Sequence, residues 1–234
     1  MSQLSDAHHL RKTVAGTCMI FGPMLLLIGL VIHPDSKTDE GAQLAVIADN
    51  LDQWFLAHLL ILISIALAVP AVLGLMHMLR ERQVAFGHVG GGLGLLGLLA
   101  LVGIVAIDGF VGWQAATVGD RGAMTTLFQQ LNDTAGVVIP FFAASFAFSV
   151  GLVCLAYGLH MARAVQWWMS LFLVVAAVCF AIAMPAALNW LAILGGAFLF
   201  VGLGSIGRMV LTESDEDWEH TPEYEGFRPM LGTR

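Results

Sequence analysis

Six long apolar runs, separated by short polar stretches, dominate the pattern of this chain. The runs cover residues 14–32, 54–79, 89–113, 136–161, 168–184 and 189–210. Each is close to the length of about 17–25 residues that a helix needs to cross the hydrocarbon core of a bilayer. The pattern therefore predicts an all-α fold, a polytopic membrane bundle of six transmembrane helices that occupies residues 1–210.

The composition agrees with a membrane protein. Of the 234 residues, 58% are hydrophobic and 12% are charged, whereas soluble domains carry about 25% charged residues. Such a chain has too few polar side chains to cover a soluble core. It also lacks the clustered lysines and arginines of a nucleic-acid-binding surface. We therefore expect the lipid bilayer as a partner and no nucleic acid.

The basic residues near the ends of the runs predict the orientation, because they concentrate on the cytoplasmic side of membrane proteins. One side carries Arg11, Lys12, Arg80, Arg82, Arg163 and Arg208, and the other carries Lys37 and Arg121. Tryptophans mark both boundaries, as in an aromatic belt: Trp54, Trp113 and Trp190 on the outer side, and Trp167 and Trp168 on the inner side. Both termini are therefore predicted to be cytoplasmic.

Two of the outer loops are long enough to hold short helices. Residues 36–52 and 120–133 each begin with a polar, cap-like stretch and continue with apolar residues at helical spacing. This pattern predicts two short amphipathic helices that lie on the outer surface of the membrane.

The two hairpins that contain these loops resemble each other. The second run ends His77-Met78-Leu79-Arg80, and the fourth ends His160-Met161-Ala162-Arg163. We interpret runs one to four as a duplicated hairpin, with runs five and six added. The alternative is that the two helix ends are similar by chance. The likeness of the two loops disfavours this alternative.

Five glycines open the third run: Gly90, Gly91, Gly92, Gly94 and Gly97. No strand-like segment precedes them and no Gly-Lys-Ser/Thr follows, so a phosphate-binding loop is disfavoured. Small residues let transmembrane helices approach closely. The glycines therefore predict tight packing of the third helix against a neighbour.

The end of the chain, residues 211–234, is predicted to be an acidic cytoplasmic tail. It carries seven acidic residues and two basic ones, hence -5 of the net charge of -7. Such a segment is typically solvated. Its three aromatic residues, Trp218, Tyr224 and Phe227, indicate instead that it docks on another surface.

A polar set is predicted at the outer side of the membrane. His58 lies four residues inside Trp54 and Asp108 five residues inside Trp113, which places the two side chains at similar depths, about 6–8 Å below the tryptophans. His33 follows the first run at the same face. We expect His33, His58 and Asp108 to line an outer polar pocket. Such a set would be a structural hydrogen-bonded pair, a proton-titrating pair or a site for a divalent metal.

The inner side offers a second set of candidate ligands. If the hairpins are duplicated, a pseudo-twofold axis would relate His77 and His160 and would bring their rings together. Two histidines from two helices are a common way to hold haem b in a membrane. The alternative is that both side chains anchor the helix ends at the head groups.

The polar landmarks also carry a resemblance. The chain contains IHPD, then DNLDQWFLAHLLILISIALAVPAVLGLMHMLRER, then a glycine-rich run that ends in AIDGF. This pattern resembles uncharacterised integral-membrane proteins of bacteria and archaea, over about the first 110 residues. The resemblance implies a six-span protein of a prokaryotic plasma membrane. It implies no activity.

Three interpretations of function stay open at this point. The chain has none of the common hydrolase or metalloprotease motifs, which favours a non-catalytic membrane subunit or a small-ligand-binding module with the outer pocket as its site. The second interpretation is a b-type haem or metal protein in electron transfer. The third is a membrane enzyme or a proton-coupled carrier that uses Asp108 and His58. A larger membrane complex or a homo-oligomer would fit each of them.

Overall fold

A computed structural model describes the backbone of residues 2–221. Side chains are described for all of these residues except 2–6, 132, 137–138, 140–141 and 144–145. The described chain is mostly helical and contains no strand. Its helices are α1 (Ser2–Ile32), α2 (Glu40–Asp49), α3 (Leu51–Met78), α4 (Val84–Val105), η1 (Ala106–Val111), α5 (Gly112–Thr117), α6 (Arg121–Asp133), α7 (Ala135–Met161), α8 (Trp167–Ala186), α9 (Asn189–Thr212) and α10 (Asp215–Trp218).

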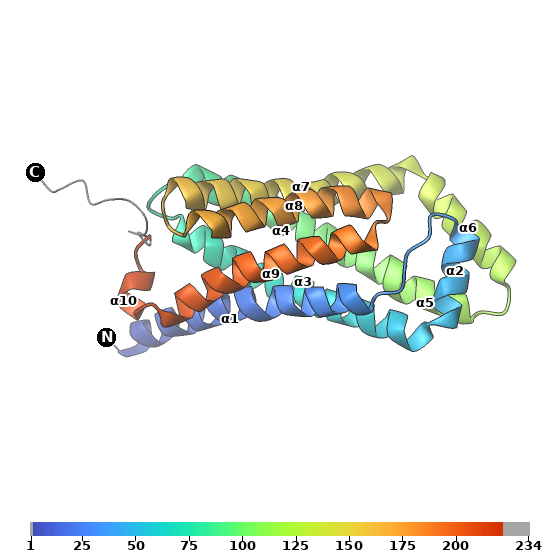
Figure 1. Ribbon diagram of the computed structural model, residues 1–234, viewed down its shortest axis with the longest axis horizontal. Helices are drawn as coiled ribbons and strands as arrows, with labels where there is room; N and C mark the ends of the chain where they lie inside the picture. Colours follow the sequence, from blue (N-terminus) through green and yellow to red (C-terminus); the bar gives the residue numbers. More distant parts are fainter. Residues whose placement is uncertain (1, 222–234) are drawn as a thin grey trace, which may run out of the picture.

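Six long helices form a closed ring. The order around it is α1, α3, α4 continued by η1 and α5, α7, α8 and α9, and α9 packs back on α1. The helices lie along the long axis of the molecule (Figure 1). One end carries α2, α5 and α6, and we call it the cap end. The opposite end carries the first residues of α1 and α10, and we call it the terminal end.

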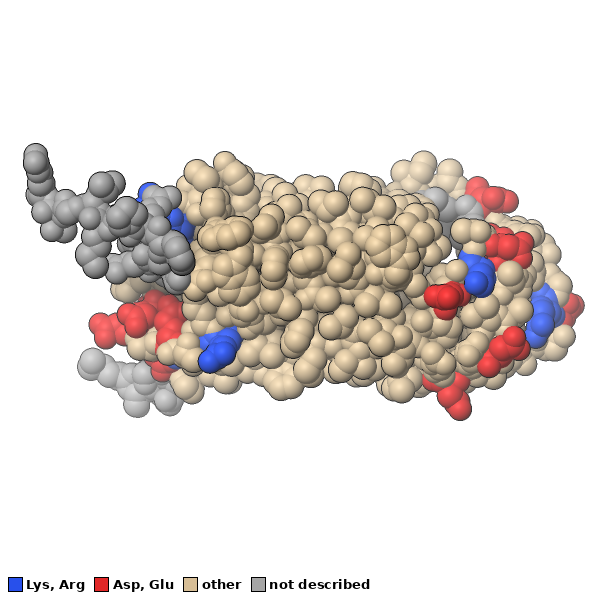
Figure 2. All heavy atoms as spheres, viewed as in Figure 1, with Lys and Arg blue, Asp and Glu red and all other residues tan. Residues whose placement is uncertain are grey.

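Among the described residues, five helices are long and apolar enough to cross a membrane. They are Ala7–Ile32, Leu51–Met78, Val84–Thr117, Trp167–Ala186 and Asn189–Thr212. Charged side chains gather at the two ends of the molecule and leave a broad uncharged band between them on the face shown in Figure 2. Large apolar side chains are exposed on the long helices, for example Leu99 (71%) on α4. The protein is therefore built as a multi-pass membrane protein.

The boundaries of these five helices agree with the apolar runs within a few residues, except that the third continues to Thr117 and the first begins earlier. The remaining predicted span corresponds to α7, which has 27 residues and runs between the same two ends (Figure 1). Its described apolar stretch, Phe146–Met161, is by itself shorter than a full span.

The packing of α4 against α7 confirms the prediction from the glycine-rich run. A Cβ atom at Gly97 would overlap the backbone of Phe148, and one at Gly151 would overlap that of Gly94. The two helices therefore touch through backbone atoms, which only glycine allows. Gly92 is different, since it has no neighbouring atom within 4 Å.

Short helices, α2 and α6, occupy the two long loops, and each is capped by an aspartate; their predicted place on the membrane surface stays a prediction. Asp39 Oδ1 accepts a hydrogen bond from the Ala42 amide (2.7 Å), and Asp120 Oδ1 accepts one from Ala123 (2.9 Å). Such N-caps stabilise a helix by about 1 kcal/mol. The two helices also contact each other.

The cap end has a small apolar core of its own. Leu44, Ile47, Trp54 and Ala115 are buried in it, with Met124 and Phe128 packed against them. Trp54 is 0% exposed, so its predicted place in a lipid-facing aromatic belt is wrong. Trp190 (64% exposed) and Trp167 (62% exposed) do lie on the surface.

The acidic end of the chain does not begin as a free tail. The helix α9 continues to Thr212, and residues 213–221 fold back on the terminal end, where Trp218 is only 2% exposed. The prediction that Trp218 docks is therefore confirmed. Tyr224 and Phe227 lie outside the described residues.

Candidate metal centre

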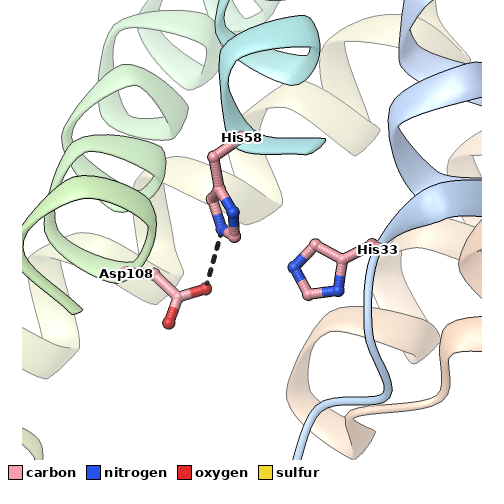
Figure 3. Close-up of side chains that lie close together, drawn as sticks. All are labelled: His33, His58 and Asp108. Carbon is pink, nitrogen blue, oxygen red and sulfur yellow. Dashed lines mark hydrogen bonds and ion pairs between the residues drawn. The ribbon is translucent and has the colours of Figure 1, made fainter. Parts of the chain in front are cut away.

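Three side chains from three separate elements meet just below the cap. His33 follows the last residue of α1, His58 lies in the second turn of α3, and Asp108 belongs to η1. Figure 3 shows their rings and carboxylate facing a common space. One ligand atom from each lies within 4.8 Å of the other two. The structure thus brings together the three residues of the predicted outer pocket.

Asp108 is placed by a break in the regular helix. The six residues Ala106–Val111 form a π-helix inside the otherwise continuous stretch Val84–Thr117. Short π-helical segments are rare, and they occur frequently at functional sites because the wider turn changes the direction of a side chain. Here the carboxylate is directed towards α3, where Asp108 Oδ2 lies 3.3 Å from His58 Nε2.

The π-helix is fixed to α3 by Trp54 and by the lack of a side chain at Gly109. Trp54 Nε1 donates a hydrogen bond to the Gly109 carbonyl (3.0 Å). A Cβ atom at Gly109 would lie within 3.0 Å of three atoms of His58. The close approach of His58 to the π-helix therefore requires glycine at this position.

The hydrogen bonds of the two histidines define which ring nitrogen carries the proton. His58 Nδ1 lies 2.9 Å from the Trp54 carbonyl, and His33 Nδ1 lies 2.6 Å from the Pro34 carbonyl. A carbonyl oxygen only accepts, so each Nδ1 must donate a proton. Each neutral ring then carries a lone pair on Nε2. Metal-binding histidines are typically oriented in this way, by an outer hydrogen bond to a carbonyl or carboxylate.

A proton or a metal ion would stabilise the contact between His58 and Asp108. With the proton of a neutral His58 on Nδ1, the lone pair of Nε2 faces the carboxylate of Asp108 at 3.3 Å, which is repulsive unless a proton or a metal ion lies between them. His33, just outside the span of α1, does not supply that proton. Burial lowers the pKa of His33, which favours the neutral form of this ring.

Trp54 and Asn189 also hold the imidazole rings of His33 and His58 and the segment beside them in place. Trp54 stacks at a tilt against both of them, with ring centroids 4.7 Å from His33 and 4.5 Å from His58. Asn189, at the start of α9, donates to the Pro34 carbonyl (3.2 Å) and to Asp35 Oδ1 (3.3 Å). The segment that carries His33 is therefore tied to α9, the neighbour of α1 in the ring.

The predicted inner histidines do not form a comparable site. His77 Nε2 donates to the Trp218 carbonyl (3.1 Å), and its ring stacks on that indole with centroids 4.6 Å apart. His160 is exposed on α7. The only group of three or more histidine, cysteine or acidic side chains close enough for a metal, among the described residues, is the outer one.

None of the family models, curated proteins or solved structures compared with this chain matches it. The chemistry of the centre therefore rests on its own geometry. Two imidazoles and one carboxylate are a ligand set that suits first-row divalent ions. Three ligands also leave coordination positions open, as in catalytic zinc sites.

Gly109→Ala is expected to lower the free energy of unfolding by about 1–3 kcal/mol, because the new methyl group overlaps the buried ring of His58. The matched control is Gly103→Ala, an exposed position on α4 with no atom within 4 Å. That variant should be neutral or more stable by up to about 1 kcal/mol. Unfolding in detergent, followed by circular dichroism, measures both. Equal stability of the two variants would contradict the close packing of Gly109 on His58.

Proposed function

We propose that this chain is a six-span protein of a prokaryotic plasma membrane with both termini in the cytoplasm. The run of α7 between the same two ends as the five apolar helices supports six spans. The basic residues support the orientation, since most of those near helix ends lie at the terminal end, for example Lys12, Arg80 and Arg208. In this orientation the cap and the three-residue centre face the outside of the cell.

The function that the geometry supports best is binding of a divalent first-row transition-metal ion by His33, His58 and Asp108. The observation that carries this proposal is the orientation of the two imidazoles. Both donate Nδ1–H to a backbone carbonyl, so both Nε2 lone pairs are available on the side of the Asp108 carboxylate. The protein is then a small-ligand-binding membrane module whose ligand is a metal ion.

The distances fit such an ion after a small movement. Metal bonds of about 2.0–2.1 Å in a tetrahedral site separate two ligand atoms by about 3.4 Å. His58 Nε2 and Asp108 Oδ2 are already 3.3 Å apart. The longest separation in the group is below 4.8 Å, so His33, which lies beyond the end of α1, would move inward by about 1 Å.

The ligand types narrow the choice of metal. No thiolate belongs to the group, which disfavours Cu(I), and one carboxylate is too few for the oxygen-rich shell of Ca²⁺. The Asp108 side chain is 49% exposed, so water or a small ligand would complete the shell of the ion. This exposure also gives the ion a route to the site.

The test is metal binding by the purified protein in lipid nanodiscs. Wild-type protein is expected to bind one equivalent of Co²⁺, with the visible absorption of a low-coordinate ion, and Zn²⁺ should displace it. Asp108→Asn should weaken the binding by at least about tenfold, because it removes the only anionic ligand. Asp49→Asn is the control, since it removes an exposed carboxylate from the same end of the molecule.

Three outcomes discriminate between the interpretations. No binding above the nanodisc background would leave Asp108 and His58 as a proton-binding or purely structural pair. Binding that Asp108→Asn does not change would place the ion elsewhere. A Soret band in the purified protein would support haem b instead, and the oligomeric state and co-purifying proteins of the same sample would show whether the chain works in a larger complex.

A further inference from the structure

Trp218, near the middle of residues 213–221, attaches the segment that follows α9 to the terminal end of the bundle. The indole lies on the ring of His77, and the Trp218 carbonyl accepts hydrogen bonds from His77 Nε2 (3.1 Å) and Arg80 Nη2 (3.0 Å). In Figure 1, α10 lies beside the start of α1. The segment thus covers the junction between α1 and the turn that connects α3 to α4.

A buried lysine joins the segment to α1. Lys12 is 6% exposed, and its ammonium group donates to the Glu213 carbonyl (2.8 Å) and forms an ion pair with Asp215. On the other side, Arg82 Nη2 donates to the Thr221 carbonyl (2.8 Å). Charged groups of the bundle therefore hold both ends of the segment.

Three further ion pairs of the segment each contain a histidine. His8 Nδ1 lies 2.6 Å from Glu219, His9 Nδ1 lies 3.1 Å from Asp215, and His220 Nδ1 lies 3.1 Å from Glu81. These contacts attach the segment to α1 and to the turn that follows α3.

Glu213 is the acid of the segment whose carboxyl group is partly enclosed by the bundle. Its Oε2 atom is buried and has no hydrogen-bond partner among the described residues. The charged groups that face it are Lys12 on α1, Asp217 on α10 and Arg80 after α3. Burial first, and then repulsion by Asp217, raise the pKa of Glu213 to about 7.

We propose that residues 213–221 form a pH-sensitive latch that closes over the terminal end of the bundle in mildly acidic conditions and is released as the pH rises through neutrality. When the segment leaves, Glu213 returns to water and ionises more easily. A carboxyl group whose pKa is higher in the closed state than in water stabilises the closed state. This stabilisation is complete at pH values below the ordinary pKa of the carboxyl group, and it is lost as the pH rises to about 7.

The latch should stay closed down to strongly acidic pH. Hydrogen bonds from Lys12 and His9 lower the pKa of Asp215, and those from Thr221 and His220 lower the pKa of Glu81. Carboxylates whose pKa is lowered in the closed state stabilise that state at pH values above their ordinary pKa. They lose this stabilising effect only as the pH falls through the lowered pKa. The closed state is therefore most stable in mildly acidic conditions.

Hydrogen exchange of the full-length protein in nanodiscs tests the proposal. The amide of Thr221 donates to Glu81 Oε2 (2.9 Å) and that of Trp218 to the Ser214 carbonyl (3.1 Å), so both should exchange slowly in the closed state. We expect the protection of residues 213–221, corrected for the intrinsic effect of pH, to fall by about tenfold from pH 6 to pH 8. Protection in the middle of α9 should not change.

Variants at Glu213 and Glu216 distinguish a pH-sensitive latch from a helix end that simply frays. Glu213→Gln removes the acid with the buried oxygen and should clearly reduce the loss of protection between pH 6 and pH 8. Glu216→Gln changes an exposed acid in the same segment and should leave that loss unchanged. Replacing His8 and His9 together by glutamine should lower the protection of the segment at both pH values, because its contacts through Glu219 and Asp215 are lost. Equal protection at pH 6 and pH 8, or the same fall in the Glu213 and Glu216 variants, would overturn the proposal.

Discussion

A His58→Gln protein is expected to bind a divalent transition-metal ion at least about 100-fold more weakly than the wild type. Loss of an outer hydrogen-bond partner alone typically costs 10–100-fold in metal affinity, so loss of a ligand should cost at least the upper value. His58 is also the member of the group that the protein orients most strictly. It is 3% exposed and is held between the Trp54 carbonyl and the π-helix.

His160→Gln is the matched control, because it makes the same chemical change at an exposed position on α7. Competition titrations with a coloured chelator, at pH 7.5 in nanodiscs, give the affinities of both variants. The unfolding of each variant should be measured in parallel, since a misfolded protein would also lose the ion. A folded His58→Gln protein with wild-type affinity would remove His58 from the site.

The sequence allowed the depth of His58 and Asp108 to be predicted, because tryptophans gave a scale along two helices. The same argument misassigned Trp54 itself. Trp54 faces inward, where it joins Leu44 and Ile47 of α2 in the cap core. Which way a tryptophan faces depends on what packs on it, and the loop helices that cover Trp54 come from elsewhere in the chain.

The π-helix could not be read from the sequence. The stretch Val84–Thr117 is apolar on almost every side, so it has no polar stripe from which a change in helical register could be detected. Asp108 alone is compatible with several directions. Its approach to His58 depends on the wide turn and on Gly109, and neither can be recognised without the position of α3.

The terminal end was predictable only in part. The aromatic residues indicated that the acidic segment docks, yet nothing local identifies the surface that Trp218 uses. That surface consists of His77 and Arg80, which are close to Trp218 only because the ring of helices closes. The similar positions of His77 and His160 suggested a shared role. In the structure, His77 contacts Trp218 of residues 213–221, whereas His160 is exposed on α7. Whether the two hairpins are duplicated stays a prediction.

Trp54→Ala is expected to lower the free energy of unfolding by about 3–5 kcal/mol, the usual cost of removing a buried tryptophan. The indole is 0% exposed, contacts His33 and His58, and donates its only hydrogen bond to Gly109 in the π-helix. Its loss leaves a cavity and removes the bond that ties η1 to α3. We therefore expect a second effect, a weaker metal site in the fraction that still folds.

Trp190→Ala separates burial from the general role of tryptophan in membrane proteins. Trp190 begins α9 at the same end of the molecule but is 64% exposed, so its loss should cost no more than about 1 kcal/mol. Unfolding of both variants in mixed detergent micelles, followed by circular dichroism, gives the comparison. If both lost equally little stability, Trp54 would face lipid after all, and the cap would have no packed connection to the metal centre. A loss confined to Trp54→Ala would mean that the same side chain holds the cap, the π-helix and both imidazoles in place.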